Sequence, residues 1–380
     1  MIATPTKGAH RAHRHTHLAR TMRSLSTGTV GENTSAIFPV GLGSLHYPSP
    51  TSVEGLRMAQ EFNHTPVLVH EVTALFDSVP AGVIVDATLG GAGHALGLLE
   101  RRADSGIFGI DRDATARAAA AARLGRFGQR VTIHAGRFSE LGAAVASGRD
   151  QGGPWPVIEG VDEPAAVVGI LADLGVSSPQ LDEPERGFSF SRPGPLDMRM
   201  DTSTGESASA LLDRIDLDEL TGLLRENGEG RFARRIARAI LAARPITTTT
   251  QLVEVVDAAV PKAGRRRGNV ASRAFQALRV EVNAEHDELQ SLLDQALDVL
   301  TPGGRLAVIS YHSGEDALVK HTFREWAEGG CVCPPHMPCV CGATSKGRLV
   351  ARRSVQATEQ EAAENRRSTS ARLRCFEVAS

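Results

Sequence analysis

The chain has 380 residues, of which 41% are hydrophobic and 23% charged, and its formal net charge is −2. A chain of this length accommodates two or three domains, and the composition is that of an ordinary globular protein. A net charge this small gives no general attraction to nucleic acid, so nucleic-acid binding would need a local basic patch. No apolar run approaches the roughly 18 residues that a membrane span needs, and we expect no membrane association.

Residues 1–57 differ in composition from the rest of the chain. They are rich in His, Arg, Ser, Thr and Gly, lack hydrophobic periodicity and contain no acidic residue before Glu32. We predict a disordered extension, or an upstream start ahead of Met58, in a cytoplasmic protein. The basic composition leaves open an organellar transit peptide, in which case the protein would lie in an organellar matrix.

Short apolar segments recur along the chain and are separated by stretches long enough for helices. They cover residues 83–86, 107–111, 131–134, 167–173 and 305–310, with a helix expected at 94–101. Uniformly apolar strands of this kind are typical of a parallel sheet that is covered on both faces. The pattern therefore predicts a doubly wound α/β domain.

Residues 186–275 interrupt this alternation with helical periodicity. We therefore expect a sheet domain formed by residues 58–185 and 276–380, with 186–275 as a helical insertion. The insertion has 15 Lys and Arg against 11 Asp and Glu. Its arginines form two groups, Arg231, Arg234, Arg235 and Arg238 on a helix and Arg265, Arg266 and Arg267 in a loop. Such groups can neutralise RNA phosphates, although a solvated helix face has the same pattern.

Acidic residues end three of the predicted strands, namely Asp86, Asp111 and Asp173. Ligands of doubly wound folds bind beyond the carboxyl ends of the strands. The turn Gly90–Gly93 follows the first strand, and Asp111 lies at the end of the second, where an acid can accept hydrogen bonds from both ribose hydroxyls. The glycines do not follow the G-x-G-x-x-G pattern, which favours a methyltransferase over an NAD enzyme. A glycine turn that only tightens a strand–helix junction is the alternative.

Longer motifs accompany these features, including DLGVSSPQLD at 173–182. The others lie at residues 64–68, 86–94, 109–113, 186–190, 194–201, 275–279, 310–316 and 365–374. In this order they resemble the signatures of the RsmH/MraW family of small-subunit ribosomal RNA cytosine-N4 methyltransferases. The resemblance extends from about His64 to Arg374.

The resemblance implies a class I, Rossmann-like methyltransferase fold with an inserted helical domain that recognises RNA. It implies binding of S-adenosylmethionine, and the residues that correspond to the family's cofactor site are Ala92, Gly93, His94, Asp111, Phe138, Asp173 and Gln180. It also implies methylation of N4 of a cytidine in the decoding centre of 16S-type rRNA, with small-subunit rRNA or a 30S-type particle as the partner. The oligomeric state stays open.

The chain departs from the family pattern at three positions. Ala92 replaces a usual glycine, which we expect to matter little if φ is negative there. Tyr311 and Gly314 stand where Phe and Leu are usual, and we expect Gly314 to loosen the loop that holds His312.

We expect Asp173 and His312 to be the catalytic residues. Asp173 can accept a hydrogen bond from an amine, and His312 can contact the base or relay a proton, although a lone histidine is as often structural. Attack at C5 of the base would use a cysteine, and none lies in a comparable strand-end motif. The alternatives are a methyltransferase for another RNA or a small-molecule amine, and a cofactor-binding ribosome assembly factor.

Four of the five cysteines lie close together, as Cys331, Cys333, Cys339 and Cys341. Four thiolates could surround Zn²⁺, but C-x-C pairs are less diagnostic than C-x-x-C pairs. Reduced thiols and a redox-sensitive disulfide are equally open, and we assign no metal ligand from the sequence.

Overall fold

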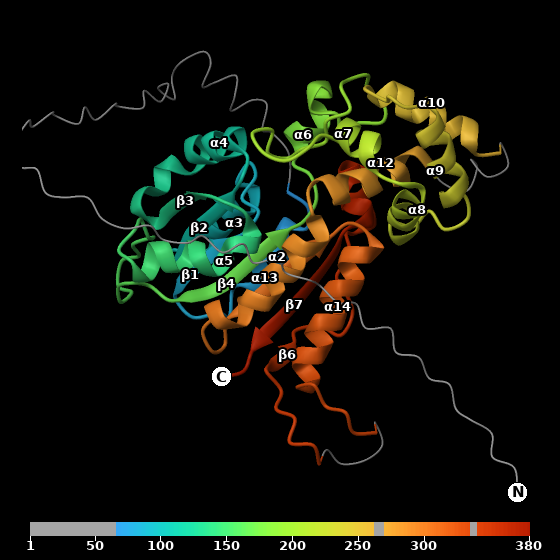
Figure 1. Cartoon of the computed structure of the whole chain (residues 1–380). Helices are drawn as coiled ribbons and strands as arrows, with labels where there is room; N and C mark the ends of the chain where they lie inside the picture. The colour runs from blue at the N-terminus through green and yellow to red at the C-terminus, as the bar shows by residue number, and fades with distance from the viewer. Residues whose placement is uncertain (1–65, 262–269, 335–339) are drawn as a thin grey trace, which may run out of the picture. The chain divides into compact units, whose positions relative to one another are not determined.

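A computed structural model describes residues 66–261, 270–334 and 340–380, and Figure 1 shows its helices and strands. The predictions for residues 1–57 lie outside these ranges. The helices are α2 (Val69–Leu75), α3 (Gly93–Arg101), α4 (Ala114–Leu124), α5 (Leu141–Val145), α6 (Ser178–Asp182), α7 (Ala208–Arg214), α8 (Leu217–Glu226), α9 (Ala233–Ala242), α10 (Thr249–Ala259), α12 (Val270–Val282), α13 (Glu285–Val299), α14 (Ser313–Glu328) and α15 (Glu359–Glu364). Among the described helices, none is both long and apolar enough to cross a membrane.

The strands form one sheet in the order β3-β2-β1-β4-β5-β7-β6. They are β1 (Gly82–Asp86), β2 (Ser105–Asp111), β3 (Val131–Ala135), β4 (Val167–Asp173), β5 (Arg305–Ser310), β6 (Gly347–Leu349) and β7 (Arg372–Val378). Strands β1 to β5 pair in parallel, whereas β7 is antiparallel to both β5 and β6. The five predicted strands are confirmed, each within two residues at either end.

The sequence pattern did not predict β6 and β7. Strand β7 contains charged residues, so a search for apolar runs does not find it. In the folded chain, two of these charged residues form ion pairs. Arg374 donates to both carboxylate oxygens of Asp316, and Glu377 accepts from Arg305 and Arg348. These ion pairs let a charged strand lie beside the buried strand β5.

Helices cover both faces of the sheet, as the α/β prediction requires. Strand β1 shows why, because Val83 and Val85 pack on one face and Ile84 packs on the other. Helices α5, α13 and α14 contribute to the first core, and α2, α3 and α4 contribute to the second. The fold is that of the class I methyltransferases.

The helices between β4 and β5 enclose a third core of their own, and Figure 1 shows α7 to α10 and α12 packed together. On α9, Ala233, Ile236 and Ile240 face this core while the arginines of the helix are exposed. Helix α12 runs through residue 275, where we placed the end of the insertion, and its residues up to Leu278 belong to the third core. The division into domains stays a prediction, with a boundary that would have to follow Leu278.

Candidate active site

The strand order brings the three strand-end acids together. Strand β1 lies between β2 and β4, so Asp86, Asp111 and Asp173 end at the same edge of the sheet. Asp111 and Asp173 line a cavity of about 380 Å³ at that edge. Gly93, His94, Phe138 and Gln180 also line it, whereas Ala92 and His312 are not among the residues of its wall. Six of the eight predicted site residues therefore meet at one cavity.

Asp111 organises the glycine turn. One carboxylate oxygen accepts from the backbone N–H of Gly90 at 2.7 Å, and the other accepts from that of Asp113 at 2.8 Å. Burial nevertheless raises the pKa of Asp111, although these two hydrogen bonds lower it. Each oxygen keeps one further acceptor position, so the carboxylate can hold the turn and accept from a ligand at the same time.

Asp173 is held by groups from two other elements, namely Tyr311 directly after β5 and His94 on α3. The Tyr311 hydroxyl donates to one of its oxygens at 2.7 Å, and Nδ1 of His94 lies 3.6 Å from the other. Nε2 of His94 lies 2.8 Å from the carbonyl of Val67, which can only accept, so this nitrogen carries a proton. Burial raises the pKa of Asp173, whereas His94 and the Tyr311 hydroxyl lower it.

Asp86 lies directly beneath the site and is only 2% exposed. The backbone N–H of Thr88 donates to it at 3.3 Å. Burial raises its pKa from 3.8 to about 7, while His94 lowers it and the other two strand-end acids raise it further. The site is thus built on a carboxyl group that the fold prefers to keep neutral.

Ala92 does not meet the condition under which we expected it to be harmless. Its φ is +58°, in the left-handed region, and it forms the N-terminal cap of α3. An alanine in this region costs about 1–2 kcal/mol relative to the right-handed form. Its side chain is fully buried in the core between the sheet and α3, so only its neighbours face the cavity.

His312 caps a helix. Its side chain accepts from the backbone N–H of Glu315 at the start of α14, and the Glu315 carboxylate accepts from the backbone N–H groups of Tyr311 and His312. Nε2 of His312 lies 3.1 Å from the same carboxylate. Burial raises the pKa of Glu315, but the contacts with His312, Arg279 and Tyr311 outweigh it and lower the pKa. This reciprocal capping also holds Gly314, so the structure gives no support to a loosened loop.

The sequence patterns did not single out the cations of the cavity wall. Arg112, Arg137 and Arg279 line the cavity, and the last two pair with Glu288 and Glu285. Arg112 and Arg279 lie inside the motifs at 109–113 and 275–279, but neither an arginine after a strand nor one on a helix gives a spacing rule for a ligand. Their position could be recognised only after the strand order was known.

The cavity fits S-adenosylmethionine in the chemistry of its donors and acceptors. Asp111 offers acceptors for ribose hydroxyls, and the Phe138 ring offers an apolar contact for a flat base. Gln180 is 5% exposed, accepts from the backbone N–H of Ser177 and lies against the cavity. A volume of about 380 Å³ lies within the range of small-molecule sites.

Comparison with known proteins gives a consistent assignment. The family described as "MraW methylase family" matches residues 61–379. "Ribosomal RNA small subunit methyltransferase H" of Pelobacter propionicus is 46% identical over 323 residues, which cover 83% of this chain and 98% of that protein. The protein of the same name from Anaeromyxobacter dehalogenans is 47% identical over 325 residues, which cover 84% of this chain and 99% of the relative.

Among solved structures, a putative rRNA-methylase from Clostridium thermocellum aligns with 83% of this chain and 99% of its own length. Its sequence identity is 12% and its TM-score 0.36, so this likeness says nothing further about the chain.

We expect Asp86 to make stability depend on pH. Its folded-state pKa is raised to about 7, so folding takes up a proton between about pH 4 and pH 7. The stabilisation from Asp86 is therefore full below about pH 4 and is lost as the pH rises through about 7. Relative to Asp86→Asn, the free energy of unfolding of the unsubstituted protein should fall over this range by an amount on the order of 2–4 kcal/mol. Urea unfolding at a series of pH values measures this difference.

Asp104 is a matched control, because Arg102 lowers its pKa. Its stabilisation is lost as the pH falls, so Asp104→Asn should give a difference of the opposite slope. Parallel curves for the unsubstituted protein and Asp86→Asn would show that Asp86 stays charged in the folded state.

Proposed function

Because the chain belongs to the MraW methylase family, we propose that it methylates N4 of a cytidine in the decoding centre of small-subunit rRNA, on the RNA or on a 30S-type particle. S-adenosylmethionine is the methyl donor. The choice of N4 as the target atom rests on the position of Asp173. Its carboxylate faces the cavity at the end of β4 and is held in place by Tyr311 and His94. Its free acceptor positions suit an exocyclic amine.

S-adenosylmethionine supplies a methyl group that its positively charged sulfur already activates. The protein must hold the acceptor in line with this group, which is mainly a matter of proximity and orientation. We assign Asp111 to the ribose, Phe138 and Gln180 to the base, and the turn at Gly93 and His94 to the part of the cofactor nearest Asp173. Gly93 suits this turn because a side chain there would collide with Pro66.

Asp173 would act on the amine of the cytosine. The lone pair of this nitrogen is delocalised into the ring, and a carboxylate that accepts from its N–H favours positive charge on the nitrogen during attack. The nitrogen must then lose a proton. Because burial raises the pKa of Asp173, this carboxylate is a stronger base than an exposed aspartate and can take the proton.

The residues of the cavity wall do not favour methylation of a ring carbon. Methylation at C5 would use a thiolate, and Cys331, Cys333, Cys341 and Cys375 are all absent from the cavity wall. His312 is turned toward Glu315 at the start of α14, so we propose that it positions this helix and the adjacent Tyr311. It would thus act on the reaction through the residues around it.

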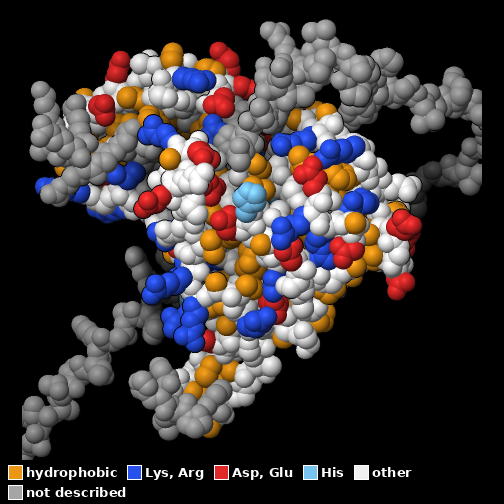
Figure 2. Space-filling view, turned by 180° about the vertical axis from the view of Figure 1, so that it is seen from behind, with side chains coloured by type: hydrophobic (Ala, Val, Ile, Leu, Met, Phe, Trp, Pro, Cys, Tyr) orange, Lys and Arg blue, Asp and Glu red, His pale blue; other side chains and the backbone are white. Residues whose placement is uncertain are grey.

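The helices between β4 and β5 are our candidate for the RNA contact. Arg231, Arg234, Arg235 and Arg238 are exposed on or beside α9, and Arg234 pairs with Asp218. Figure 2 shows one face of the molecule, on which Lys and Arg side chains are interspersed with Asp and Glu. A surface of mixed charge suits contacts with phosphates at separate points of a folded RNA. The second predicted group, Arg265 to Arg267, lies outside the described residues.

The test of the proposed function is the identity of the product. We expect incubation with labelled S-adenosylmethionine and small ribosomal subunits, followed by digestion and mass spectrometry, to give N4-methylcytidine. Asp173→Asn should lower the rate at least 100-fold, roughly the effect of losing a positioned general base, while cofactor binding persists. A 5-methylcytidine, a methyladenosine or equal transfer to free cytidine would overturn the assignment, and stable binding to subunits without transfer would favour an assembly factor.

We expect Asp111→Ala to weaken binding of S-adenosylmethionine roughly 10- to 100-fold, since hydrogen bonds to a charged group contribute about 1.5–3 kcal/mol. Calorimetric titration measures this affinity. Because Asp111 also holds Gly90, the control is Asp104→Ala, which removes a carboxylate at the opposite end of β2. That variant should lose stability without losing affinity, and an unchanged affinity in Asp111→Ala would remove Asp111 from the ribose role.

We expect Tyr311→Phe to shift the pH profile of the reaction. The hydroxyl lowers the pKa of Asp173, so its loss raises that pKa and moves the acidic limb of kcat/KM to higher pH. A shift of up to about one pH unit corresponds to a hydrogen bond of ordinary net strength. The variant should recover at alkaline pH. An unshifted profile, or a loss of rate that is equal at every pH, would contradict the role of Tyr311.

We expect Arg235→Glu together with Arg238→Glu to weaken RNA binding and to reduce its dependence on salt. Arg234 is left unchanged because it already pairs with Asp218. The matched control reverses Lys320 on α14 and Lys346 before β6, two exposed cations away from α9. Binding of rRNA is measured at several salt concentrations, and cofactor affinity should stay the same in both variants. Equal salt slopes for the two variants would mean that α9 presents only a solvated face.

A further inference from the structure

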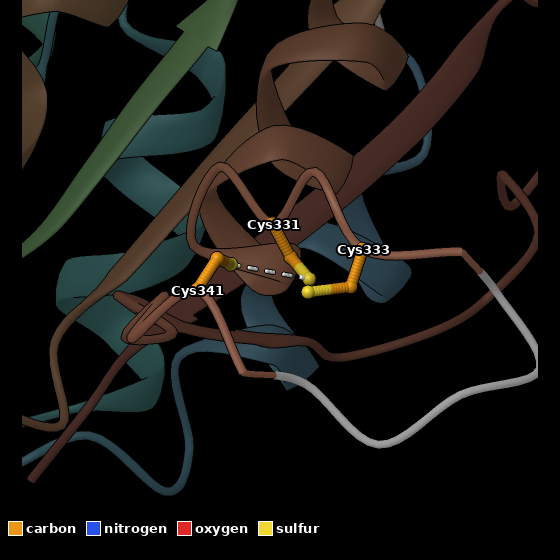
Figure 3. Close-up of side chains that lie close together, drawn as sticks. All are labelled: Cys331, Cys333 and Cys341. Atoms are coloured by element: carbon orange, nitrogen blue, oxygen red, sulfur yellow. Dashed lines mark hydrogen bonds between the residues drawn. The ribbon is translucent and has the colours of Figure 1, made fainter.

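Three thiol groups converge in the loop between α14 and β6, on the side of the molecule away from the start of α14. The sulfur atoms of Cys331, Cys333 and Cys341 all lie within 4.8 Å of one another. Figure 3 shows the three side chains pointing toward a common centre from two segments of the loop. Residues that are up to ten positions apart thus present the same soft ligand atom to one point.

The spacing of the sulfur atoms matches a metal site better than a disulfide. Sγ of Cys341 lies 3.7 Å from Sγ of Cys331, whereas bonded sulfur atoms are about 2.05 Å apart. In a tetrahedral site with Zn–S bonds of about 2.3 Å, neighbouring sulfur atoms are about 3.8 Å apart. The loop therefore already holds two of its sulfurs at the edge length of a zinc–thiolate tetrahedron.

The backbone around the thiols is arranged as in a thiolate site. The backbone N–H of Val340 points at Sγ of Cys333 at 3.4 Å. Cysteine binds metal as the thiolate, whose sulfur can accept such a hydrogen bond. Val332 is 85% exposed and Val340 is 88% exposed. The two valines thus point outward from a loop in which the sulfurs of Cys331, Cys333 and Cys341 point inward.

The base of this loop is held by backbone hydrogen bonds from Cys331 to Glu328 and from Lys346 to Trp326. The valines bury little apolar area, although burial of each side chain would stabilise the fold by about 1.5–3 kcal/mol. Because the apolar side chains of this loop are exposed and its thiols point inward, we expect a group bound by the thiols to order the loop.

We propose that Cys331, Cys333 and Cys341 bind one Zn²⁺ ion as thiolates. Three S–H bonds are broken, three Zn–S bonds form and the three protons pass to solvent, without any change of oxidation state. Cys339 lies outside the described residues, and the proposed site consists of the other three. Zinc favours thiolate ligands in tetrahedral geometry, and the three sulfurs would occupy three of its four positions.

The proposed ion is structural. Helix α14 separates the loop from the active site, and its 16 residues span about 24 Å. The ion would tie the loop together next to β6, the edge strand of the sheet. It would therefore affect the stability of this edge and not the transfer of the methyl group.

The experiment uses the full chain, purified under reducing conditions without chelator. We expect elemental analysis to give about one zinc per chain, as one tetrahedral site requires. Replacement by Co²⁺ should give thiolate-to-cobalt charge-transfer absorption together with the strong visible bands of tetrahedral cobalt. In the unsubstituted protein, removal of zinc by a chelator should accelerate proteolysis within residues 329–346.

The double variant Cys331→Ser, Cys341→Ser should retain no stoichiometric zinc and show no charge-transfer band. Cys375→Ala is the matched control, because Cys375 is buried in β7 and lies outside the cluster. That variant should keep the ion. Binding of S-adenosylmethionine by the double variant should stay unchanged, which shows that the chain is folded. The proposal is overturned if the reduced protein binds neither zinc nor cobalt through sulfur, or if the double variant retains the full amount of zinc.

Discussion

The site depends on one constraint, which is that three carboxyl groups end adjacent parallel strands at the same edge of a covered sheet. Burying a charged carboxylate costs free energy unless hydrogen bonds or opposite charges compensate. The fold compensates for this cost in a different way at each of the three positions. Asp111 receives two backbone N–H groups, Asp173 receives a hydroxyl and faces an imidazole, and Asp86 has its pKa raised to about 7.

Because their partners differ, the three carboxyl groups are suited to different roles. A carboxylate that is fixed by backbone donors keeps its direction, which suits the recognition of hydroxyl groups. Asp173 has only side-chain partners and a raised pKa, so it can gain and lose a proton without disturbing the backbone. Asp86 has little access to ligands because it is 2% exposed, but it holds the backbone N–H of Thr88, whose hydroxyl accepts from the backbone N–H of Asp173. In the proposed reaction, the same side chain at three equivalent strand ends would thus serve binding, proton transfer and support of the site.

Sequence patterns predicted the parts of this arrangement that follow from local chemistry. The apolar runs placed β1 to β5, and the strand-end acids followed because parallel strands end at one edge. The patterns did not predict β7, since Arg374 and Glu377 find their partners on other elements. They also could not decide the role of His312, because its neighbour Glu315 acts as a helix cap only in the folded chain. The positive φ of Ala92 could not be predicted from the sequence either, because it depends on how α3 packs on the sheet.

The helical segment is joined to the cavity by buried polar contacts. Asn283, at the end of α12, donates to the carbonyl of Met198 and accepts from the backbone N–H of Met200. Arg186 donates to the carbonyl of Met200 and to Asp113, which follows β2. Met200 itself lines the cavity.

These contacts satisfy backbone groups of a loop in which Met198 has a φ of +63°. An unpaired buried group would cost about 1–3 kcal/mol, so the loop cannot move away from α12 without exposing or orphaning several of them. Helix α12 in turn packs in the core that supports α9. The polar contacts of Asn283 and Arg186 thus fix the loop that carries Met200 to the cavity wall, and the same core holds both α12 and α9.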